Sequence, residues 1–137
     1  IDNDHMSWVT YTSPEIATFG LSEQEIKKRK LRYDVIVQDL SDVDRAIVDE
    51  DTGGKLVVLL RKRKILGGSM VAENAGELFQ ELQLAMSSGL DIGSLFKKIY
   101  PYPTASRVNK KAVMRMLSSK LTPAIKRFLK ISYRWSS

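Results

Sequence analysis

A loop with two tyrosines and two prolines is the segment of this sequence best suited to bind a ligand. It reads Tyr100-Pro101-Tyr102-Pro103-Thr104, and its prolines fix φ and exclude a helix there. Rigid loops on a folded scaffold commonly carry binding groups, so the two phenols are candidates to contact a ligand. The alternative is that both tyrosines pack against the protein and the prolines only turn the chain.

The acidic residues offer two further candidates. Glu77 and Glu81 are four residues apart, so a helix would place both carboxylates on one face. General acid–base catalysis also needs a partner with a perturbed pKa, and we interpret Glu77 as a helix cap and Glu81 as a solvent-facing charge. The acid-rich segment 39–51 has Asp44 where a calcium loop requires glycine, which indicates a solvated loop.

Cysteine is absent and histidine occurs once, as His5. Residues 1–6 (IDNDHM) are typical of a cloning junction, and we leave them out of the fold prediction. Without native Cys or His, the sequence excludes a thiolate or haem site, and we predict no metal site. The dinucleotide, Walker and nucleophile-elbow glycine patterns are also missing.

Length and composition indicate one globular domain. The chain has 137 residues, of which 43% are hydrophobic and 28% charged. No apolar run approaches the ~20 residues of a membrane span, and we expect a cytoplasmic location.

Residues 1–91 hold 11 Lys and Arg and all 16 Asp and Glu, whereas residues 92–137 hold 11 Lys and Arg and no acid. This asymmetry favours either an anionic partner for the C-terminal third or a solvated basic face.

The periodicity of apolar residues predicts the elements that must position the loop. We expect strands over 8–12, 16–19, 33–40, 55–60 and 65–72, and helices over 23–30, 74–88, 91–99, 107–118 and 122–135. Ser22 and Glu25 form a capping box, and Gly67-Gly68 predicts a bulge or a close backbone approach. The order of elements predicts an α+β fold, a mostly antiparallel sheet with helices packed on one side.

Six short motifs stand in an order found in one domain family. They are TSPEIA with GLSE (12–17 and 20–23), RA (45–46), GKL (54–56), ILG (65–67), NAGEL (74–78) and YPT (102–104). Each motif is weak alone, but the consistent order and spacing are specific. Over about residues 8–117 the chain resembles the C-terminal dimerisation domain of the pyridine nucleotide-disulfide oxidoreductases, which include dihydrolipoamide dehydrogenase, glutathione reductase and mercuric reductase.

The resemblance implies that residues 7–120 are the dimerisation module of a FAD-dependent NAD(P)H oxidoreductase, inactive as an isolated fragment. FAD, NAD(P) and the redox cysteines would belong to a missing N-terminal part, and this fragment would bind no cofactor. The module would form a homodimer, with no nucleic-acid partner. The interface residues implied are Asn74, Gly76, Glu77 and Tyr102, with Gly76 permitting close backbone approach. Pro103 and Thr104 would reach the partner's FAD, and we expect Tyr102 to project from its own protomer.

The loop departs from the commonest family pattern at two positions. Family members usually carry His where Tyr102 stands, paired with a Glu where Arg107 aligns. A phenol with a pKa near ~10 is a poor base at neutral pH, so Tyr102 would occupy the catalytic position as a hydrogen-bond donor. Tyr at this position is similar to the mercuric reductase branch, whose C-terminal cysteine pair is absent here.

The last residues, 121–137, lie outside the resemblance and form a predicted basic amphipathic helix. Its cationic arc holds Lys126, Arg127, Lys130 and Arg134. Such a helix is compatible with weak, peripheral contact to an anionic membrane, or it packs its apolar side on the domain. The alternative function is a standalone basic module that binds anionic lipid or nucleic acid.

Overall fold

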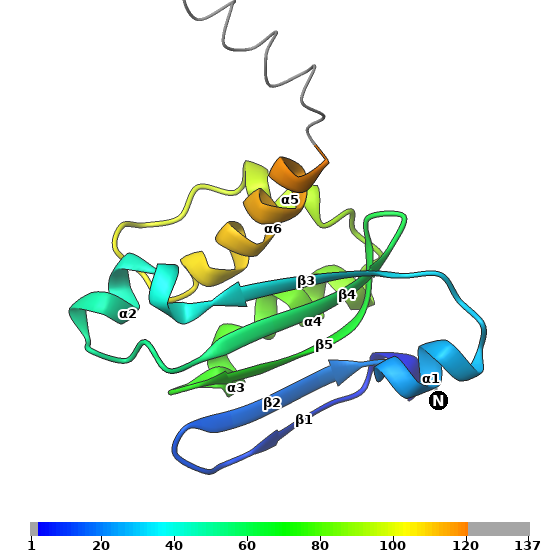
Figure 1. The fold of residues 1–137 in the computed structure, drawn as a ribbon, viewed down its shortest axis with the longest axis horizontal. Helices are drawn as coiled ribbons and strands as arrows, with labels where there is room; N and C mark the ends of the chain where they lie inside the picture. The colour runs from blue at the N-terminus through cyan, green and yellow to red at the C-terminus, as the bar shows by residue number, and fades with distance from the viewer. Residues whose placement is uncertain (1–2, 121–137) are drawn as a thin grey trace, which may run out of the picture.

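The computed structural model of the chain describes residues 3–120 and consists of an antiparallel sheet with a layer of helices (Figure 1). The strands are β1 (Ser7–Thr10), β2 (Glu15–Gly20), β3 (Asp34–Asp39), β4 (Lys55–Arg61) and β5 (Lys64–Ala72). They lie in the order β1-β2-β5-β4-β3, and each neighbouring pair is antiparallel. The prediction of an α+β fold is confirmed.

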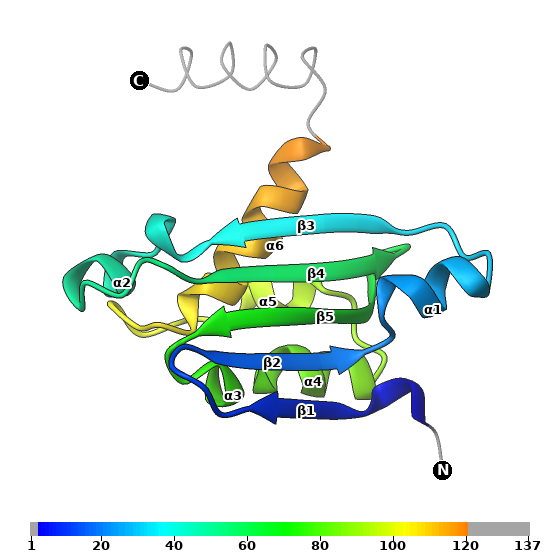
Figure 2. The same cartoon turned by 60° about the horizontal axis from the view of Figure 1, so that its bottom comes forward.

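The helices gather mostly on one face of this sheet. They are α1 (Glu23–Lys28), α2 (Asp44–Val48), α3 (Ala75–Leu78), α4 (Gln80–Ser87), α5 (Gly93–Lys97) and α6 (Arg107–Ser119), with short 3₁₀ helices η1 (Asn3–His5) and η2 (Leu40–Asp42). Figure 2 shows α3 to α6 behind the sheet, while α1 and α2 lie at its two ends. Alternate strand residues therefore face a covered layer, as period-two patterning requires.

The main core lies between the sheet and this helix layer. Phe19 of β2 stacks on Phe79, with ring centroids 5.3 Å apart, and both side chains are buried. Gly68 of β5 makes room for this pair, because a Cβ added there would lie 2.6 Å from Phe19 Cζ. The prediction of close backbone approach at the glycine pair is confirmed, and the sheet register shifts between Leu59 and Leu60 opposite it.

The predicted helix over 74–88 is divided into α3 and α4 at Phe79. Asn74 has φ 58° and makes no capping hydrogen bond through its side chain, although asparagine before a helix is a preferred N-cap residue. The carboxylate of Glu15, on β2, instead accepts the Gly76 N–H at 3.0 Å. A partner from a distant strand replaces the local cap, which is a contact that sequence spacing does not reveal.

Two other local predictions stand and one is revised. The Ser22–Glu25 capping box is present at the start of α1. Gly89 follows α4 with φ 60°, as expected of a glycine that ends a helix. The β4–β5 turn is tighter than predicted: Arg61 pairs with Lys64, and the turn consists of two residues with positive φ.

The N-terminal residues that we set aside contact the domain. The main-chain carbonyl of Met6 accepts the Gly20 N–H at 2.8 Å, and Asp4 forms an ion pair with Arg29 at 2.5 Å. Leaving out residues 3–6 was therefore wrong for the fold, because they extend the β1–β2 edge. Their origin in a cloning junction stays a prediction.

Replacing Gly68 by alanine tests the packing between sheet and helices. We expect Gly68→Ala to lower the free energy of unfolding by about 1–3 kcal/mol, because the new Cβ overpacks the Phe19 ring. Gly53→Ala is the matched control, since nothing lies within 4 Å of a Cβ added there. Urea unfolding of both variants measures the difference, and an equal effect at the two glycines would contradict the packing role of Gly68.

Candidate functional site

The Tyr-Pro-Tyr-Pro loop connects α5 to α6 and presents its two tyrosines differently. Tyr102 is 69% exposed, whereas Tyr100 is 6% exposed. The expectation that Tyr102 projects from its own protomer is confirmed. The alternative in which both tyrosines pack is correct for Tyr100 alone.

Around Tyr102 the loop is braced by short contacts. Thr104 Oγ1 donates a hydrogen bond to the carbonyl of Pro101 at 3.0 Å. The guanidinium carbon of Arg107 lies 5.2 Å from the centroid of the Tyr102 ring, a cation–π distance. Among residues 3–120 the Tyr102 hydroxyl has no hydrogen-bond partner, and Pro103 beside it is exposed. The phenol is therefore free to contact a group outside the protomer.

The carboxylate of Glu81, on α4, holds both ends of this loop. Its Oε1 accepts from the Tyr100 hydroxyl at 2.8 Å and from Asn109 Nδ2 at 2.6 Å. Its Oε2 forms an ion pair with Lys98 at 2.6 Å. Asn109 is fully buried and also donates to the carbonyl of Leu78 at 2.8 Å. The loop between α5 and α6 is thus fixed to α4 by hydrogen bonds to one carboxylate.

This cluster corrects the sequence interpretation of Glu81 as a solvent-facing charge. The side chain of Glu81 is only 16% exposed, whereas Glu77 is exposed. The sequence does indicate a buried polar contact on this helix, because Asn109 lies beside Val108 and Ala112 on its predicted apolar face. A buried asparagine requires partners, but the sequence does not name them.

Burial raises the pKa of the Tyr100 phenol well above its usual value, and the hydrogen bond to Glu81 adds to the shift. Burial disfavours the charged phenolate, and a neighbouring carboxylate disfavours it further. Tyr100 therefore stays protonated at neutral pH and acts as a donor to Glu81. Its role is to anchor the loop, which leaves Tyr102 as the exposed phenol.

The three α3 residues assigned to the dimer interface lie in different surroundings. Asn74 and Glu77 are exposed, whereas Gly76 is buried. A Cβ added to Gly76 would lie 3.3 Å from Val9 Cγ2, and its N–H is bound to Glu15. Gly76 therefore permits a close contact inside its own protomer, and its place in the dimer interface stays a prediction.

Exposed apolar side chains flank the loop. Ile99 is 91% exposed immediately before Tyr100, and Phe96 at the end of α5 is also exposed. With Tyr102 they are three exposed side chains in or just before the loop, and we call this set the loop surface. Exposed apolar groups near one another are typical of protein–protein contacts.

Two other kinds of site are absent from the described part of the chain. Residues 3–120 contain no group of three or more His, Cys, Asp or Glu placed to hold a metal ion. Within the same residues, no helix combines the length and the apolar character that crossing a membrane requires. The predicted basic helix over 121–137 lies outside the described residues.

Comparison with known proteins decides the family. Residues 6–113 match the model of the pyridine nucleotide-disulphide oxidoreductase dimerisation domain. The chain belongs to this family. The match confirms the resemblance drawn from the six motifs. Members of the family are flavoenzymes that use FAD and NAD(P).

Individual members share the domain with the chain but are much longer. The chain is 42% identical to mercuric reductase of Bacillus cereus over 108 residues, which cover 77% of the chain and 17% of that protein. It is 40% identical to dihydrolipoyl dehydrogenase of Buchnera aphidicola over 100 residues, which cover 72% of the chain and 21% of that protein. The chain therefore spans about a fifth of the length of these relatives.

Solved structures of the family share the fold. LpdA from Mycobacterium tuberculosis superimposes with a TM-score of 0.77 at 24% identity, covering 85% of the chain and 26% of that protein. The Cu(II) complex of the flavoprotein disulfide reductase RclA from Escherichia coli gives 0.74 at 21% identity, covering 82% and 26%. The five-stranded sheet with its helices is the dimerisation-domain fold of flavoprotein disulfide reductases.

Removing the Glu81 carboxylate tests the anchoring of the loop. We expect Glu81→Ala to lower the free energy of unfolding by about 2–4 kcal/mol, because the buried donors of Tyr100 and Asn109 lose their shared acceptor. Glu77→Ala, four residues earlier and exposed, is expected to change it by less than about 0.5 kcal/mol. Denaturant unfolding measures both variants, and equal costs would show that Glu81 does not anchor the loop.

The raised pKa of Tyr100 predicts a loss of stability in alkali. The unfolded chain releases this proton at a lower pH than the folded chain, so the free energy of unfolding falls as the pH rises through about 10, by at most about 1.4 kcal/mol per pH unit. Tyr100→Phe removes this contribution, and Tyr11→Phe, at an exposed site, retains it. Unfolding at several pH values from about 8 to 11 compares the variants, and identical slopes in Tyr100→Phe and the wild type would contradict the prediction.

Proposed function

We propose that this chain is the dimerisation module of a FAD-dependent NAD(P)H oxidoreductase and that its Tyr-Pro-Thr loop completes the partner subunit's flavin site. The observation that carries the proposal is an exposed Tyr102 on a loop tied to α4 at both ends. A phenol fixed in this way can donate a hydrogen bond outside its own protomer without a large entropic cost of ordering.

The residues of the loop fit a neighbouring flavin as binding groups. Tyr102 offers a hydroxyl without a partner among residues 3–120, and Pro103 and Thr104 follow it on the same loop. FAD, held by the rest of the longer protein, would carry electrons from NAD(P)H to the acceptor. This chain would contribute orientation and one hydrogen bond from Tyr102, and on its own it would be inactive and bind no flavin.

The neighbour of Tyr102 sets the chemistry that this loop can support. Arg107 lies over the phenol ring where most family members place a carboxylate, so the group that would accept a hydrogen bond from the usual His and stabilise its protonated form is replaced by a cation. Since a phenol near neutral pH is a donor, we propose that Tyr102 acts through hydrogen bonding and that thiol acid–base catalysis is not the role of this loop.

The proposed homodimer would use the loop surface of the helix layer. Phe96, Ile99 and Tyr102 place apolar groups on one exposed surface, and the family's domain name states its role in dimerisation. Asn74, just before α3, and Glu77, on α3, are exposed and are proposed to extend the interface. A cytoplasmic location, peripheral membrane contact and the absence of nucleic acid as a partner remain predictions.

The oligomeric state of the purified chain tests the interface. We expect a dimer, and we expect Ile99→Glu to weaken it by about tenfold or more, because a charge would be buried at an apolar contact. Val35→Glu is the control, since Val35 is also an exposed apolar residue but lies on β3, where its neighbour Ile36 is buried. Sedimentation equilibrium distinguishes them. A monomeric wild-type chain, or dissociation by Val35→Glu alone, would reject this interface.

Tyr102→Phe in the intact oxidoreductase tests the contribution to the flavin site. We expect turnover to fall while the free energy of unfolding changes by less than about 1 kcal/mol, because only one hydrogen bond is removed. Steady-state NAD(P)H oxidation and thermal unfolding give the two readouts, with Tyr11→Phe as the control. Unchanged turnover would reject the role of Tyr102, and stoichiometric FAD binding by the isolated chain would reject the proposed division of labour.

A further inference from the structure

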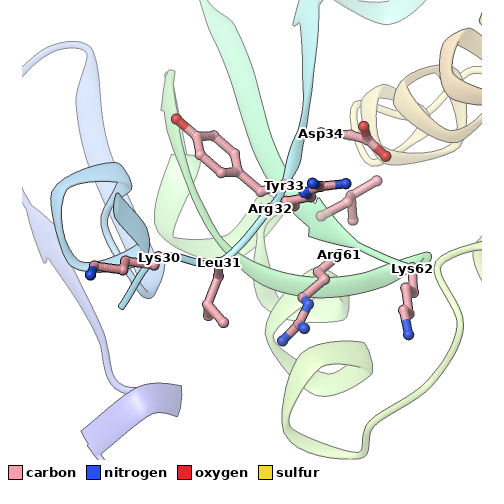
Figure 3. A pocket seen from close by; sticks show the side chains of 8 residues that line it. Lys30, Leu31, Arg32, Tyr33, Asp34, Arg61 and Lys62 are labelled. Carbon is pink, nitrogen blue, oxygen red and sulfur yellow. The ribbon is translucent and has the colours of Figure 1, made fainter. Parts of the chain in front are cut away.

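A basic groove lies at the end of the sheet remote from the Tyr102 loop. It has a volume of about 810 Å³ and lies between the α1–β3 connection and the β4–β5 hairpin. Four cationic side chains line it, together with Leu31 and the Tyr33 ring (Figure 3). The four are Lys30, Arg32, Arg61 and Lys62. Two segments separated by about thirty residues in the sequence thus contribute four cationic residues to the lining of one hollow.

The cations beside the groove are neutralised, and those that line it are not. Lys27 pairs with Glu23 at 2.8 Å, and Arg63 pairs with Asp91 at 2.7 Å. Within residues 3–120, none of the four groove cations forms an ion pair. Asp34 supplies the single carboxylate among the lining residues. The groove therefore concentrates positive charge that the protein itself leaves uncompensated.

The groove also has an apolar part of fixed geometry. The Tyr33 hydroxyl donates a hydrogen bond to the Glu23 carboxylate, which holds the ring at one end of the groove. Leu31 is half-buried, and with Tyr33 it packs against the small apolar cluster of Leu21, Ile26 and Leu59. A ligand in the groove would therefore meet an apolar surface beside the cations.

We propose that this groove binds a small phosphorylated molecule carrying two or three linked phosphate groups. Four cations without an ion-pair partner among residues 3–120 line this hollow, and a cleft lined by charges of one sign raises the local concentration of the opposite ion. A compact polyanion matches that charge, and Arg32 and Arg61 provide the planar donors that pair with phosphate. Binding along nucleic acid would need cations spread over an extended surface. The groove instead confines them to the volume of a small ligand.

Titration of the full 137-residue chain tests the proposal, independently of the proposed dimerisation function. The probes are inorganic tripolyphosphate and ATP, measured by isothermal titration calorimetry at low salt and at about 0.5 M salt, where screening is strong. We expect both probes to bind at low salt with a stoichiometry of one per chain, and binding to weaken steeply at high salt. Tighter binding of ATP would support contact of the organic part with Leu31 and Tyr33.

Substitutions assign the binding to this groove. Arg32→Gln with Arg61→Gln is expected to weaken binding by about tenfold or more, because two charge-assisted contacts are lost. These positions are preferred to Lys30 and Lys62, whose positive φ couples a substitution to the backbone. Lys97→Gln with Lys120→Gln removes the same charge from exposed residues outside the groove and is expected to change binding by less than about twofold.

The substitution Asp34→Asn is expected to change the affinity for tripolyphosphate in the opposite direction. Removing the only carboxylate that lines the groove is expected to tighten tripolyphosphate binding by about two- to fivefold, and it tests the site even where the double arginine variant fails to fold. The proposal is overturned by absence of binding at low salt or by equal losses in the two double variants. Preferential binding of polyglutamate over tripolyphosphate would also overturn it, in favour of an acidic peptide.

Discussion

The carboxylate of Glu81 is the constraint on which the presentation of the loop depends. One side chain on α4 accepts from Tyr100 and Asn109 and pairs with Lys98, so it ties both ends of the loop to the helix layer. A buried carboxylate is tolerated only when donors surround it. The same donors, in turn, need that carboxylate. This mutual dependence fixes Tyr100 inward, and the prolines that follow then leave Tyr102 directed outward.

The sheet provides the rigid base for this arrangement through close packing at its centre. Phe19 stacks on Phe79 at the point where α3 gives way to α4, and Gly68 leaves the space that the ring occupies. The contact sets the height of α4 above the sheet, and with it the position of Glu81. Packing in the core and geometry at the surface are thus linked through one helix.

The charged residues divide into two groups with different roles. Surface ion pairs near α1 and the β4–β5 turn, such as Lys27 with Glu23 and Arg63 with Asp91, contribute little stability where solvent screens them. The cations of the basic groove lack such partners within the described residues. Their positive charge therefore remains available to attract an anionic ligand. The loop surface and the basic groove lie on different elements, one between α5 and α6 and one beside α1.

The strands, most helices, the fold class and the family can be predicted from the amino-acid order alone, because strand alternation, helix periodicity, the Ser22–Glu25 capping box and six ordered motifs are local signals. The same local signals identify Tyr102 as a candidate binding residue. Four features follow from the folded arrangement instead: the burial of Tyr100, the anchoring of the loop by Glu81, the capping of α3 by Glu15, and the groove lined by four cations. Each of these depends on contacts between residues distant in sequence, and their distances are set by how the helices pack on the sheet, which local patterns do not encode.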